Sequence, residues 1–180
     1  MFKKNLRKQL IQIRKKNYLE TNLKHVHNVY KVIKKYNNLK VIGGYMPINY
    51  EYDCSNLLKF LEIKNYTICL PVIKNNFEMN FYKYSFQNPL KINKLGIPEP
   101  INLSNKVIPD LILVPLVGFD KDLNRLGYGG GFYDRYFEKN SKLKKMIKIG
   151  LAFSFQKIKK LPINKFDKKL DKIITEKNLI

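Results

Sequence analysis

Cysteine and histidine are scarce in this chain of 180 residues. Cys54 and Cys69 are too few for a disulfide framework, and they lack the C-x-x-C spacing of common zinc sites. His25 and His27 lie two residues apart on a predicted helix, so they point in different directions and make a poor metal pair. Long apolar runs are also missing: no stretch approaches the roughly 20 apolar residues of a membrane-spanning helix, and residues 1–16 do not form a signal peptide. We therefore expect a cytoplasmic protein with reduced thiols and no membrane partner.

Acidic residues are few as well, with 14 Asp and Glu against 35 Lys and Arg and a formal net charge of +21. Such a field attracts polyanions, including nucleic acids, nucleotides and polyanionic small molecules. Codon bias in an AT-rich genome would also produce the charge, because Lys, Asn, Ile, Tyr and Phe are all abundant. The basic residues are spread along the whole chain, whereas a nucleic-acid module concentrates them on one helix or face. Both origins of the charge stay open.

The length of the chain suits one domain, residues 1–180, and its 44% hydrophobic residues are enough for a single core. Hydrophobic periodicity and turn signals predict alternating helices and strands. Helices are expected over residues 2–16, 21–36, 57–61 and 132–139, and strands over residues 41–46, 67–72, 77–84, 111–117, 147–153 and 173–175. This order indicates an α/β fold: a single layered α/β domain, Rossmann-like, with a mostly parallel central sheet flanked by helices. Ligands of such sheets bind outside the carboxyl ends of the strands.

Local signals refine these elements. Thr21 and Ser55 are expected to act as helix N-caps, and Pro71 is expected to close its strand. Residues 77–84 alternate apolar and polar positions, which predicts a half-exposed strand. Residues 85–109 are rich in Asn and Pro and are expected to be mostly loop.

The first predicted helix is amphipathic. Phe2, Leu6, Leu10 and Ile13 recur at intervals of three and four residues between lysines and arginines. This spacing places all four on one apolar stripe of the helix.

Glycine is concentrated in one segment of the second half. Four glycines lie between residues 127 and 131, after the apolar strand 111–117 and before a predicted helix. Glycine lets backbone N–H groups approach an anion, and the helix adds its positive end, so the segment is typical of a phosphate cradle. Arg125, Asp134 and Arg135 flank it and supply cations for phosphate oxygens and a carboxylate for Mg²⁺. The pattern is neither a P-loop nor the dinucleotide fingerprint, and a flexible tight turn is the alternative.

The order and spacing of these motifs resemble those of the 5-formyltetrahydrofolate cyclo-ligase family. The family's signature is similar to residues 110–115, residues 118–120 and the glycine-rich run at residues 125–135. The likeness extends over nearly the whole chain. Further similar segments are residues 3–7, 51–53, 96–100, 150–153, 161–162 and 174–176, together with Gln156, Asp167 and Asp171.

The resemblance implies a reaction and its co-substrates. From 5-formyltetrahydrofolate, with or without a polyglutamate tail, and from ATP in the presence of Mg²⁺, the enzyme would make 5,10-methenyltetrahydrofolate, ADP and phosphate. Phosphorylation of the formyl oxygen would create the leaving group that the folate's own nitrogen then displaces. The implied protein is a monomer without a specific nucleic-acid partner.

The resemblance also implies roles for individual residues. ATP would be held by two segments, Lys3, Lys4, Asn5, Leu6 and Arg7 in the first, and Arg125, Leu126, Gly127, Tyr128, Gly129, Gly130, Gly131, Phe132 and Tyr133 in the second. Arg7 and Arg125 would be the catalytic residues. Asp134 and Asp167 would hold Mg²⁺.

The folate would contact two residues, Met46 and Glu51. The Glu51 carboxylate can accept hydrogen bonds from the N–H groups of the pterin ring. A solvated loop carboxylate is the alternative for Glu51, and a surface acid paired with a lysine is the alternative for Asp167. Packing in the core is the alternative for the aromatic residues Tyr128, Phe132, Tyr133 and Tyr136, of which Tyr128 and Tyr133 are the better candidates for ligand contact.

Two positions depart from the family's pattern. Leu123 stands where glycine is usual, which leaves open how the loop before Arg125 turns. Phe166 stands where histidine is common, which removes a polar neighbour from Asp167.

Two other functions stay open from the sequence. A basic nucleic-acid-binding module would use the net charge and exposed aromatic residues, and it predicts a basic stripe without an ordered ATP site. Another nucleotide-dependent ligase or kinase on the same fold would keep the glycine-rich segment and have a different second pocket.

Overall fold

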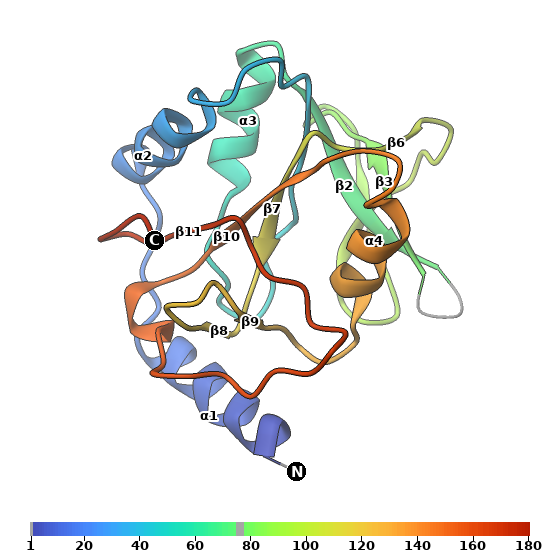
Figure 1. Cartoon of the computed structure of the whole chain (residues 1–180). Coiled ribbons are helices and arrows are strands. Elements are labelled where there is room, and N and C mark those ends of the chain that lie inside the picture. The colour runs from blue at the N-terminus through green and yellow to red at the C-terminus, as the bar shows by residue number, and fades with distance from the viewer. Residues whose placement is uncertain (1, 75–77) are drawn as a thin grey trace.

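The computed structural model describes residues 2–74 and 78–180, and Figure 1 shows the whole chain. The helices are α1 (Phe2–Lys16), α2 (Leu23–Ile33), α3 (Ser55–Ile63) and α4 (Phe132–Asn140), with a 3₁₀ turn η2 (Ser154–Gln156). The strands are β1 (Val41–Gly43), β2 (Thr67–Ile73), β3 (Met79–Lys83), β4 (Leu90–Ile92), β5 (Pro98–Pro100), β6 (Lys106–Val107), β7 (Leu111–Pro115), β8 (Gly118–Phe119), β9 (Arg125–Leu126), β10 (Ile147–Leu151) and β11 (Lys172–Ile174). Within the described ranges no helix combines the length and apolarity that crossing a bilayer requires.

Seven strands form the main sheet in the order β11-β10-β7-β1-β2-β3-β6. The strands from β11 to β2 pair in parallel, whereas β3 and β6 pair antiparallel. The apolar run predicted as a central strand is β7, which lies between β10 and β1. The predicted α/β fold with a mostly parallel central sheet is confirmed.

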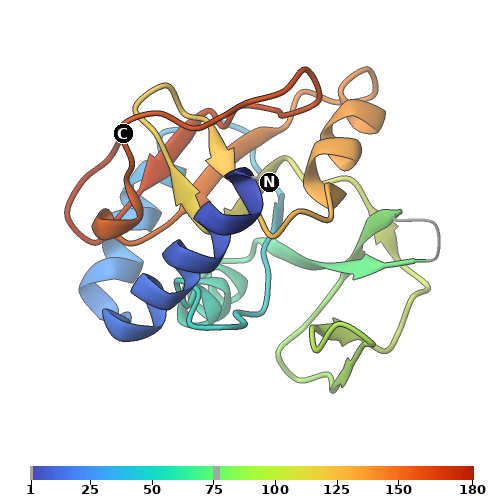
Figure 2. The same cartoon turned by 90° about the horizontal axis from the view of Figure 1, so that it is seen from below.

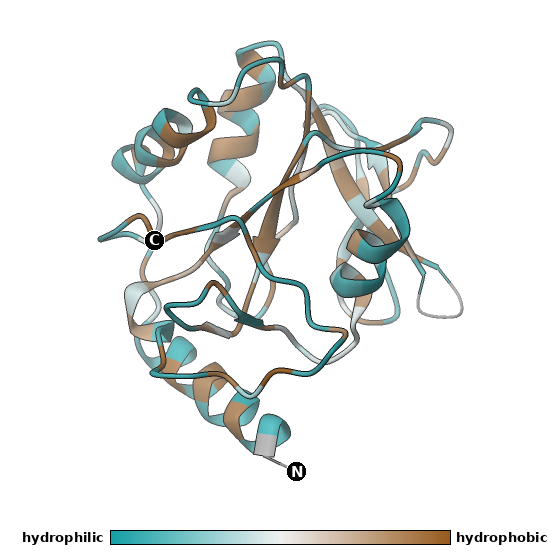
Figure 3. Ribbon diagram, in the orientation of Figure 1, coloured by the Kyte–Doolittle hydropathy of each residue, from teal (hydrophilic) through white to brown (hydrophobic). Residues whose placement is uncertain are grey.

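Both faces of β7 are covered, because its alternate side chains enter different hydrophobic clusters. Leu111 and Leu113 pack with buried residues of α2 and α3, whereas Ile112 and Val114 pack with α4. Figure 1 shows the same layering, with α2 and α3 on one side of the sheet and α4 on the other. In Figure 3 the central strands are hydrophobic and α4 presents a hydrophilic outer surface. The helices therefore flank the sheet as the alternating sequence predicted.

The strand order reverses between β1 and β7. From β1 the chain passes through α3 to β2 on one side, and from β7 it passes through α4 to β10 on the other. The carboxyl ends of β1 and β7 therefore open onto the crevice where α/β proteins bind ligands. Figures 1 and 2 show α1 and the β8–β9 hairpin together at this end of the sheet. Leu10 of α1 packs there against Val117 and Leu126.

Helix α1 has the predicted bounds, but its buried face differs from the predicted stripe. Leu10 is buried, whereas Ile13 is 42% exposed. The next residue, Arg14, is the one that turns inward, with 0% exposure. The Phe2 side chain lies outside the described part of the structure. The prediction was wrong for Ile13 because the helix packs on a partly polar surface at the strand ends, which binds a guanidinium.

Both predicted N-caps are wrong. Asn22 caps α2: its Oδ1 accepts a hydrogen bond from the His25 N–H at 3.3 Å, and His25 Nδ1 accepts one from the Asn22 N–H at 3.0 Å. Thr21 instead donates its hydroxyl to the carbonyl of Asp53 at 2.8 Å. Ser55 is the first residue of α3, and its N–H donates to Oδ1 of Asp53 at 2.8 Å. The side chains of Asn22 and Asp53 thus accept N–H groups at the helix starts where Thr21 and Ser55 were expected to do so.

Strand β2 continues through Pro71, so the prediction that Pro71 closes the strand is wrong. Proline has no N–H to donate, but β1 pairs with β2 only from Thr67 to Cys69. On the other side Pro71 faces Phe81 of β3. Proline is therefore tolerated where the parallel partner has already ended.

The prediction of a half-exposed strand at residues 77–84 is also wrong. Phe77 lies outside the described residues, and β3 is buried except at Lys83. Helix α4 covers it, with the Phe81 and Tyr136 rings 5.1 Å apart. Residues 85–109 are mostly loop, as predicted, with the short strands β4, β5 and β6 inside them.

Candidate active site

The glycine-rich segment forms the loop between β9 and α4. Strands β8 and β9 pair antiparallel and carry this loop, and the sequence analysis did not predict them. Gly129 has φ of 105° and Gly131 has φ of 66°, a left-handed conformation that side-chain-bearing residues rarely adopt. Gly131 is the N-cap of α4 and offers no capping side chain. No described side chain therefore caps the positive end of α4, an arrangement that favours an anion.

Two basic residues of α1 lie against this loop. Arg7 Nε donates to the carbonyl of Gly127 at 2.7 Å, and the Arg7 guanidinium carbon lies 3.2 Å from where a Cβ on Gly129 would be. Lys3, one turn earlier, pairs with Asp167 at 2.6 Å. The first turns of α1 thus bring positive charge to the glycine loop.

The other predicted ATP residues of α1 and β9 lie in two environments. Lys4 and Asn5 are exposed. Leu6 and Leu126 join the hydrophobic cluster beneath α1. Arg7 and Lys3 are therefore the only residues of this segment whose described polar contacts reach the loop or Asp167.

The first turn of α4 carries the end of the predicted ATP segment. Phe132 and Tyr133 are half-buried there. The Arg135 guanidinium donates to the carbonyl of Gly130 at 2.6 Å and lies 5.5 Å from the centre of the Phe132 ring. Arg135 thus fixes the loop from the α4 side, as Arg7 does from the α1 side.

Arg125 is engaged within the protein. Its side chain is only 5% exposed and pairs with Asp134 at 2.9 Å. It also donates to the carbonyl of Lys168 at 2.6 Å and lies 5.4 Å from the centre of the Phe137 ring. Arg125 therefore anchors the start of α4 to the segment that contains Asp167.

The two predicted metal ligands lie on neighbouring segments. Asp134 Oδ1 accepts hydrogen bonds from Arg125 and from the Lys168 N–H, the latter at 2.9 Å. Asp167 Oδ2 accepts from Lys3 and from the Asn164 N–H at 2.7 Å, so a surface acid paired with a lysine also describes it. In both carboxylates the other oxygen takes none of the described hydrogen bonds.

These carboxylates fit the needs of Mg²⁺. No group of three or more His, Cys, Asp or Glu side chains within residues 2–74 and 78–180 could hold a metal on its own. Mg²⁺ in nucleotide sites is held by one or two carboxylates together with phosphate oxygens and waters. Asp134 and Asp167 lie on neighbouring segments, since the Lys168 N–H donates to Asp134, and Phe166 beside them is 68% exposed.

Leu123 adopts the conformation that glycine would take. Its φ is 63°, in the left-handed region. Its carbonyl accepts the Leu170 N–H at 3.0 Å, which ties the hairpin turn to the C-terminal segment. The buried Asp120 carboxylate accepts hydrogen bonds from Asn124 and the Leu161 N–H and holds the same turn. The hairpin therefore closes in spite of the departure at Leu123.

Glu51 is 4% exposed, so the alternative of a solvated loop carboxylate is wrong. Its Oε2 accepts the Ile48 N–H at 3.0 Å. Burial raises the pKa of Glu51 from 4.5 to about 7, against the lowering effects of the Ile48 N–H, the Arg14 charge and a Tyr128 hydrogen bond. Burial and the nearby Glu51 charge in turn raise the pKa of Tyr128 to about 12. Glu51 thus titrates near neutrality and Tyr128 stays protonated.

The segment after β1 places Met46 near Glu51. The sulfur of Met46 lies 4.0 Å from Oγ of Ser55, and the side chain is half-buried. The Tyr45 hydroxyl donates to the Tyr52 carbonyl at 2.7 Å and closes the turn that contains Glu51. Met46 and Glu51 therefore belong to one loop after β1.

Sequence analysis missed Arg14. Its guanidinium donates to the carbonyls of Asn49 and Leu116 and to the Tyr128 hydroxyl. The signal that could have identified it is spacing: Arg14 is seven residues after Arg7, two helical turns along the same face.

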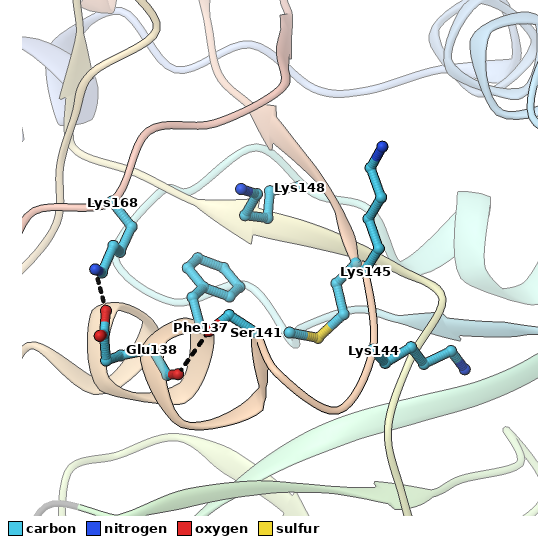
Figure 4. A pocket seen from close by; sticks show the side chains of 8 residues that line it. Phe137, Glu138, Ser141, Lys144, Lys145, Lys148 and Lys168 are labelled. Atoms are coloured by element: carbon cyan, nitrogen blue, oxygen red, sulfur yellow. Dashed lines mark hydrogen bonds and ion pairs between the residues drawn. The ribbon is translucent and has the colours of Figure 1, made fainter.

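A separate pocket lies at the far end of α4, beside the beginning of β10 (Figure 4). Its volume is about 240 Å³, and its lining includes four lysines with Phe137 and Met146. In Figure 4, Lys168 contacts Glu138. Lys144 pairs with Asp110 at 2.6 Å. None of the predicted site residues lines this pocket, and its lysines largely serve ion pairs.

Comparison with known sequences identifies a family. A sequence model of the 5-formyltetrahydrofolate cyclo-ligase family matches residues 1–176. The chain is 38% identical over 135 residues to the 5-formyltetrahydrofolate cyclo-ligase of Haemophilus influenzae, a match that covers 71% of each chain.

Comparison with solved structures agrees. A 5,10-methenyltetrahydrofolate synthetase from Mycoplasma pneumoniae superposes with a TM-score of 0.75 at 30% identity, over 97% of this chain and 98% of the other. The NMR structure of the Aquifex aeolicus 5,10-methenyltetrahydrofolate synthetase gives a TM-score of 0.79 at 32% identity, over 99% of this chain and 92% of the other.

Because the pKa of Glu51 is raised, the free energy of unfolding should fall as pH rises. A carboxyl with pKa 4.5 when unfolded and about 7 when folded binds its proton more tightly in the folded state, so stability falls as pH rises through this window. Glu51→Gln does not titrate. Its free energy of unfolding relative to wild type should therefore increase by about 3 kcal/mol between pH 4.5 and pH 8, at about 1.4 kcal/mol per pKa unit. Urea unfolding of both proteins across this range measures the difference, and a constant difference would contradict the assignment.

Proposed function

Because this chain belongs to the 5-formyltetrahydrofolate cyclo-ligase family, we propose that it uses ATP and Mg²⁺ to close the ring of 5-formyltetrahydrofolate in the crevice between β1 and β7. The enzyme converts 5-formyltetrahydrofolate to 5,10-methenyltetrahydrofolate. The observation that carries the proposed site is the contact of Tyr128 in the glycine loop with Glu51 in the loop after β1. The two loops follow β7 and β1, between which the strand order reverses.

On the β7 side, the phosphates of ATP would lie on the glycine loop. The uncapped start of α4 supplies N–H donors, and Arg7 and Lys3 supply positive charge from α1. Arg7 lies directly against the loop, with its Nε 2.7 Å from the carbonyl of Gly127. Arg125 would act by holding Asp134 in place, since its own donors already have partners.

Asp134 and Asp167 would hold Mg²⁺. When bound, the ion would balance the charge of the phosphate oxygens. Lys3 and Arg125 neutralise these two carboxylates in the structure described. Arg125 would stay on Asp134, whereas the partly exposed Lys3 would shift from Asp167 to a phosphate oxygen.

On the β1 side, the pterin ring would lie against Met46 and Glu51. An ionised Glu51 carboxylate accepts N–H groups of the amino-pyrimidinone edge. A buried carboxylate recognises such donors strongly, because a ligand without them leaves its charge unsatisfied.

The chemistry needs the two substrates in alignment. The formamide oxygen is a poor leaving group, so transfer of the γ-phosphoryl group to it would make an iminium phosphate. The nitrogen at position 10 of the folate then attacks the formyl carbon, which closes the ring and expels inorganic phosphate. ADP is the other product, formed in the phosphoryl transfer. Little covalent help is required from the protein, which contributes positioning and charge stabilisation. We propose that one domain, residues 1–180, acts in this way as a monomer.

The high net charge does not require a nucleic-acid function. Lys139 of α4 and Lys148 of β10 form ion pairs, as do Lys144 and Lys168 beside them, and the two substrates proposed here are themselves anions. We propose no specific nucleic-acid partner.

The direct test of the proposed function is turnover. Purified protein with ATP and Mg²⁺ should convert 5-formyltetrahydrofolate to the methenyl product, followed by its near-ultraviolet absorbance, and EDTA should abolish the reaction. Folded protein that makes no methenyl product would refute the reaction. Full activity in EDTA would refute the roles of Asp134 and Asp167.

Arg7 and its neighbour Lys8 offer a matched pair of variants on one helical turn. Arg7→Met should lower kcat/KM for ATP by roughly 100-fold, or about 3 kcal/mol, because a cation at a charged transition state is lost. The KM for 5-formyltetrahydrofolate should change little. Lys8 is exposed, so Lys8→Met should behave as wild type. Equal effects of the two substitutions would mean that only the general charge of α1 matters.

A further inference from the structure

Arg14 is a fully buried cation without a direct ion pair. Its exposure is 0%, and among the described residues its guanidinium forms no salt bridge. A buried charge is costly unless it is paired and fully hydrogen-bonded, and an apolar side chain of similar volume often serves stability as well. Packing alone therefore does not explain an arginine at this position of α1.

The hydrogen bonds of Arg14 reach three separate segments. Nε and one terminal nitrogen donate to the carbonyl of Asn49, at 3.1 and 2.8 Å. The other terminal nitrogen donates to the carbonyl of Leu116 at the end of β7, at 3.1 Å. The remaining bond goes to the Tyr128 hydroxyl, and the guanidinium carbon lies 5.5 Å from the centre of the Tyr128 ring. One side chain thus joins the loop after β1, the end of β7 and the glycine loop.

The Asn49 contact stabilises a strained turn. Asn49 has φ of 48° and Tyr50 has φ of 62°, so two successive residues with side chains are left-handed. Such conformations persist only where the surroundings hold them, and they concentrate at functional sites. The next residue is Glu51. The two hydrogen bonds from Arg14 to the Asn49 carbonyl therefore fix the backbone from which the Glu51 side chain projects.

The Tyr128 contact links the same cation to Glu51. The Tyr128 hydroxyl accepts a hydrogen bond from Arg14, and the same side chain lowers the pKa of the Glu51 carboxylate. Tyr128 thus lies between a cation and a carboxylate, across the crevice between the two loops.

We propose that Arg14 is a positioning residue that holds the Asn49–Glu51 turn and the glycine loop at Tyr128 in one fixed arrangement, so that the two bound substrates are aligned for reaction. This inference rests on the proposed placement of folate at Glu51 and of ATP at the glycine loop. Arg14 touches neither substrate and acts through the backbone of Asn49 and the hydroxyl of Tyr128.

The same contacts act on the ionisation of Glu51. Arg14 and Tyr128 both lower the pKa of Glu51 against the larger raising effect of burial. The other titratable groups that face Glu51 are Tyr133 from α4 and Tyr45 and Cys54 from the loop after β1. Loss of the Arg14 contact should therefore shift the acidic limb of the pH profile for folate to higher pH.

The test compares Tyr128→Phe, Arg14→Lys and the double variant with wild type. Tyr128→Phe deletes the hydroxyl and leaves the backbone bonds of Arg14 intact. Tyr66→Phe is the matched control, since Tyr66 precedes β2 at the opposite end of the sheet from the proposed site. The measurements are kcat, both KM values, Tm, the pH profile of kcat/KM for folate, and the Kd of 5-formyltetrahydrofolate alone and of a non-hydrolysable ATP analogue alone.

We expect kcat to fall about 10-fold in each single variant, because misalignment slows the chemical step while each substrate still binds its own loop. Each Kd should stay within about threefold of wild type, since uniform binding is kept. The kcat of the double variant should be no lower than that of the slower single variant, because both residues act through the hydrogen bond between Arg14 and Tyr128. The acidic limb should move to higher pH in both single variants and stay in place in Tyr66→Phe.

Folded Tyr128→Phe protein with wild-type kcat and an unmoved pH profile would overturn the proposal, as would effects that multiply in the double variant. A lower Tm with unchanged kcat would show that Arg14 is only structural and would also overturn it. If Arg14→Lys fails to fold, the kcat and pH profile of Tyr128→Phe decide alone. Wild type is measured first, so an inactive wild type marks failure of the proposed function, whereas an active wild type with unaffected variants marks failure of this inference.

Discussion

Parallel pairing of β1 with β7 sets the geometry on which the site depends. The chain leaves these strands in opposite directions, through α3 on one side and through the β8–β9 hairpin and α4 on the other. Neither path covers the crevice between the strand ends, so loops and the N-terminal helix α1 must close it. The site is consequently built from four segments far apart in the sequence: residues 3–14, 46–51 and 125–134, and the segment that contains Asp167. Their relative placement depends on contacts between segments, and the Arg14 guanidinium makes several of them.

Electrostatics separates structural acids from the acid proposed to bind substrate. Asp110 has a direct cation partner in Lys144, and Asp120 accepts several N–H groups that lower its pKa despite burial. Glu51 differs: it is buried, no described salt bridge involves it, and its pKa is raised to about 7. Burial of the charged form of Glu51 reduces stability at neutral pH, because it outweighs the favourable effect of Arg14. Perturbed acids of this kind are concentrated at functional sites.

Much of the fold follows from the sequence, because long apolar runs leave strong periodic patterns. The central strand within residues 111–117 and the bounds of α1 were predicted for that reason. The glycine loop was predicted from its glycines and its place between a strand and a helix, whereas the role of Glu51 came only from the family resemblance. The two-residue strands of the β8–β9 hairpin were missed because they are too short to show a period. Arg14 was missed because an arginine in an amphipathic pattern is assigned to solvent, and only tertiary packing turns it inward.

Hydrogen exchange with one substrate at a time most directly tests the claim that two loops bind two substrates on either side of the β1–β7 crevice. With 5-formyltetrahydrofolate alone, the account predicts slowed exchange in residues 44–53. With Mg²⁺ and a non-hydrolysable ATP analogue alone, it predicts slowed exchange in residues 2–8 and 126–134. Protection of one and the same segment by both ligands would contradict the account, as would protection by the ATP analogue of residues 141–148, around the lysine-lined pocket, in place of the glycine loop.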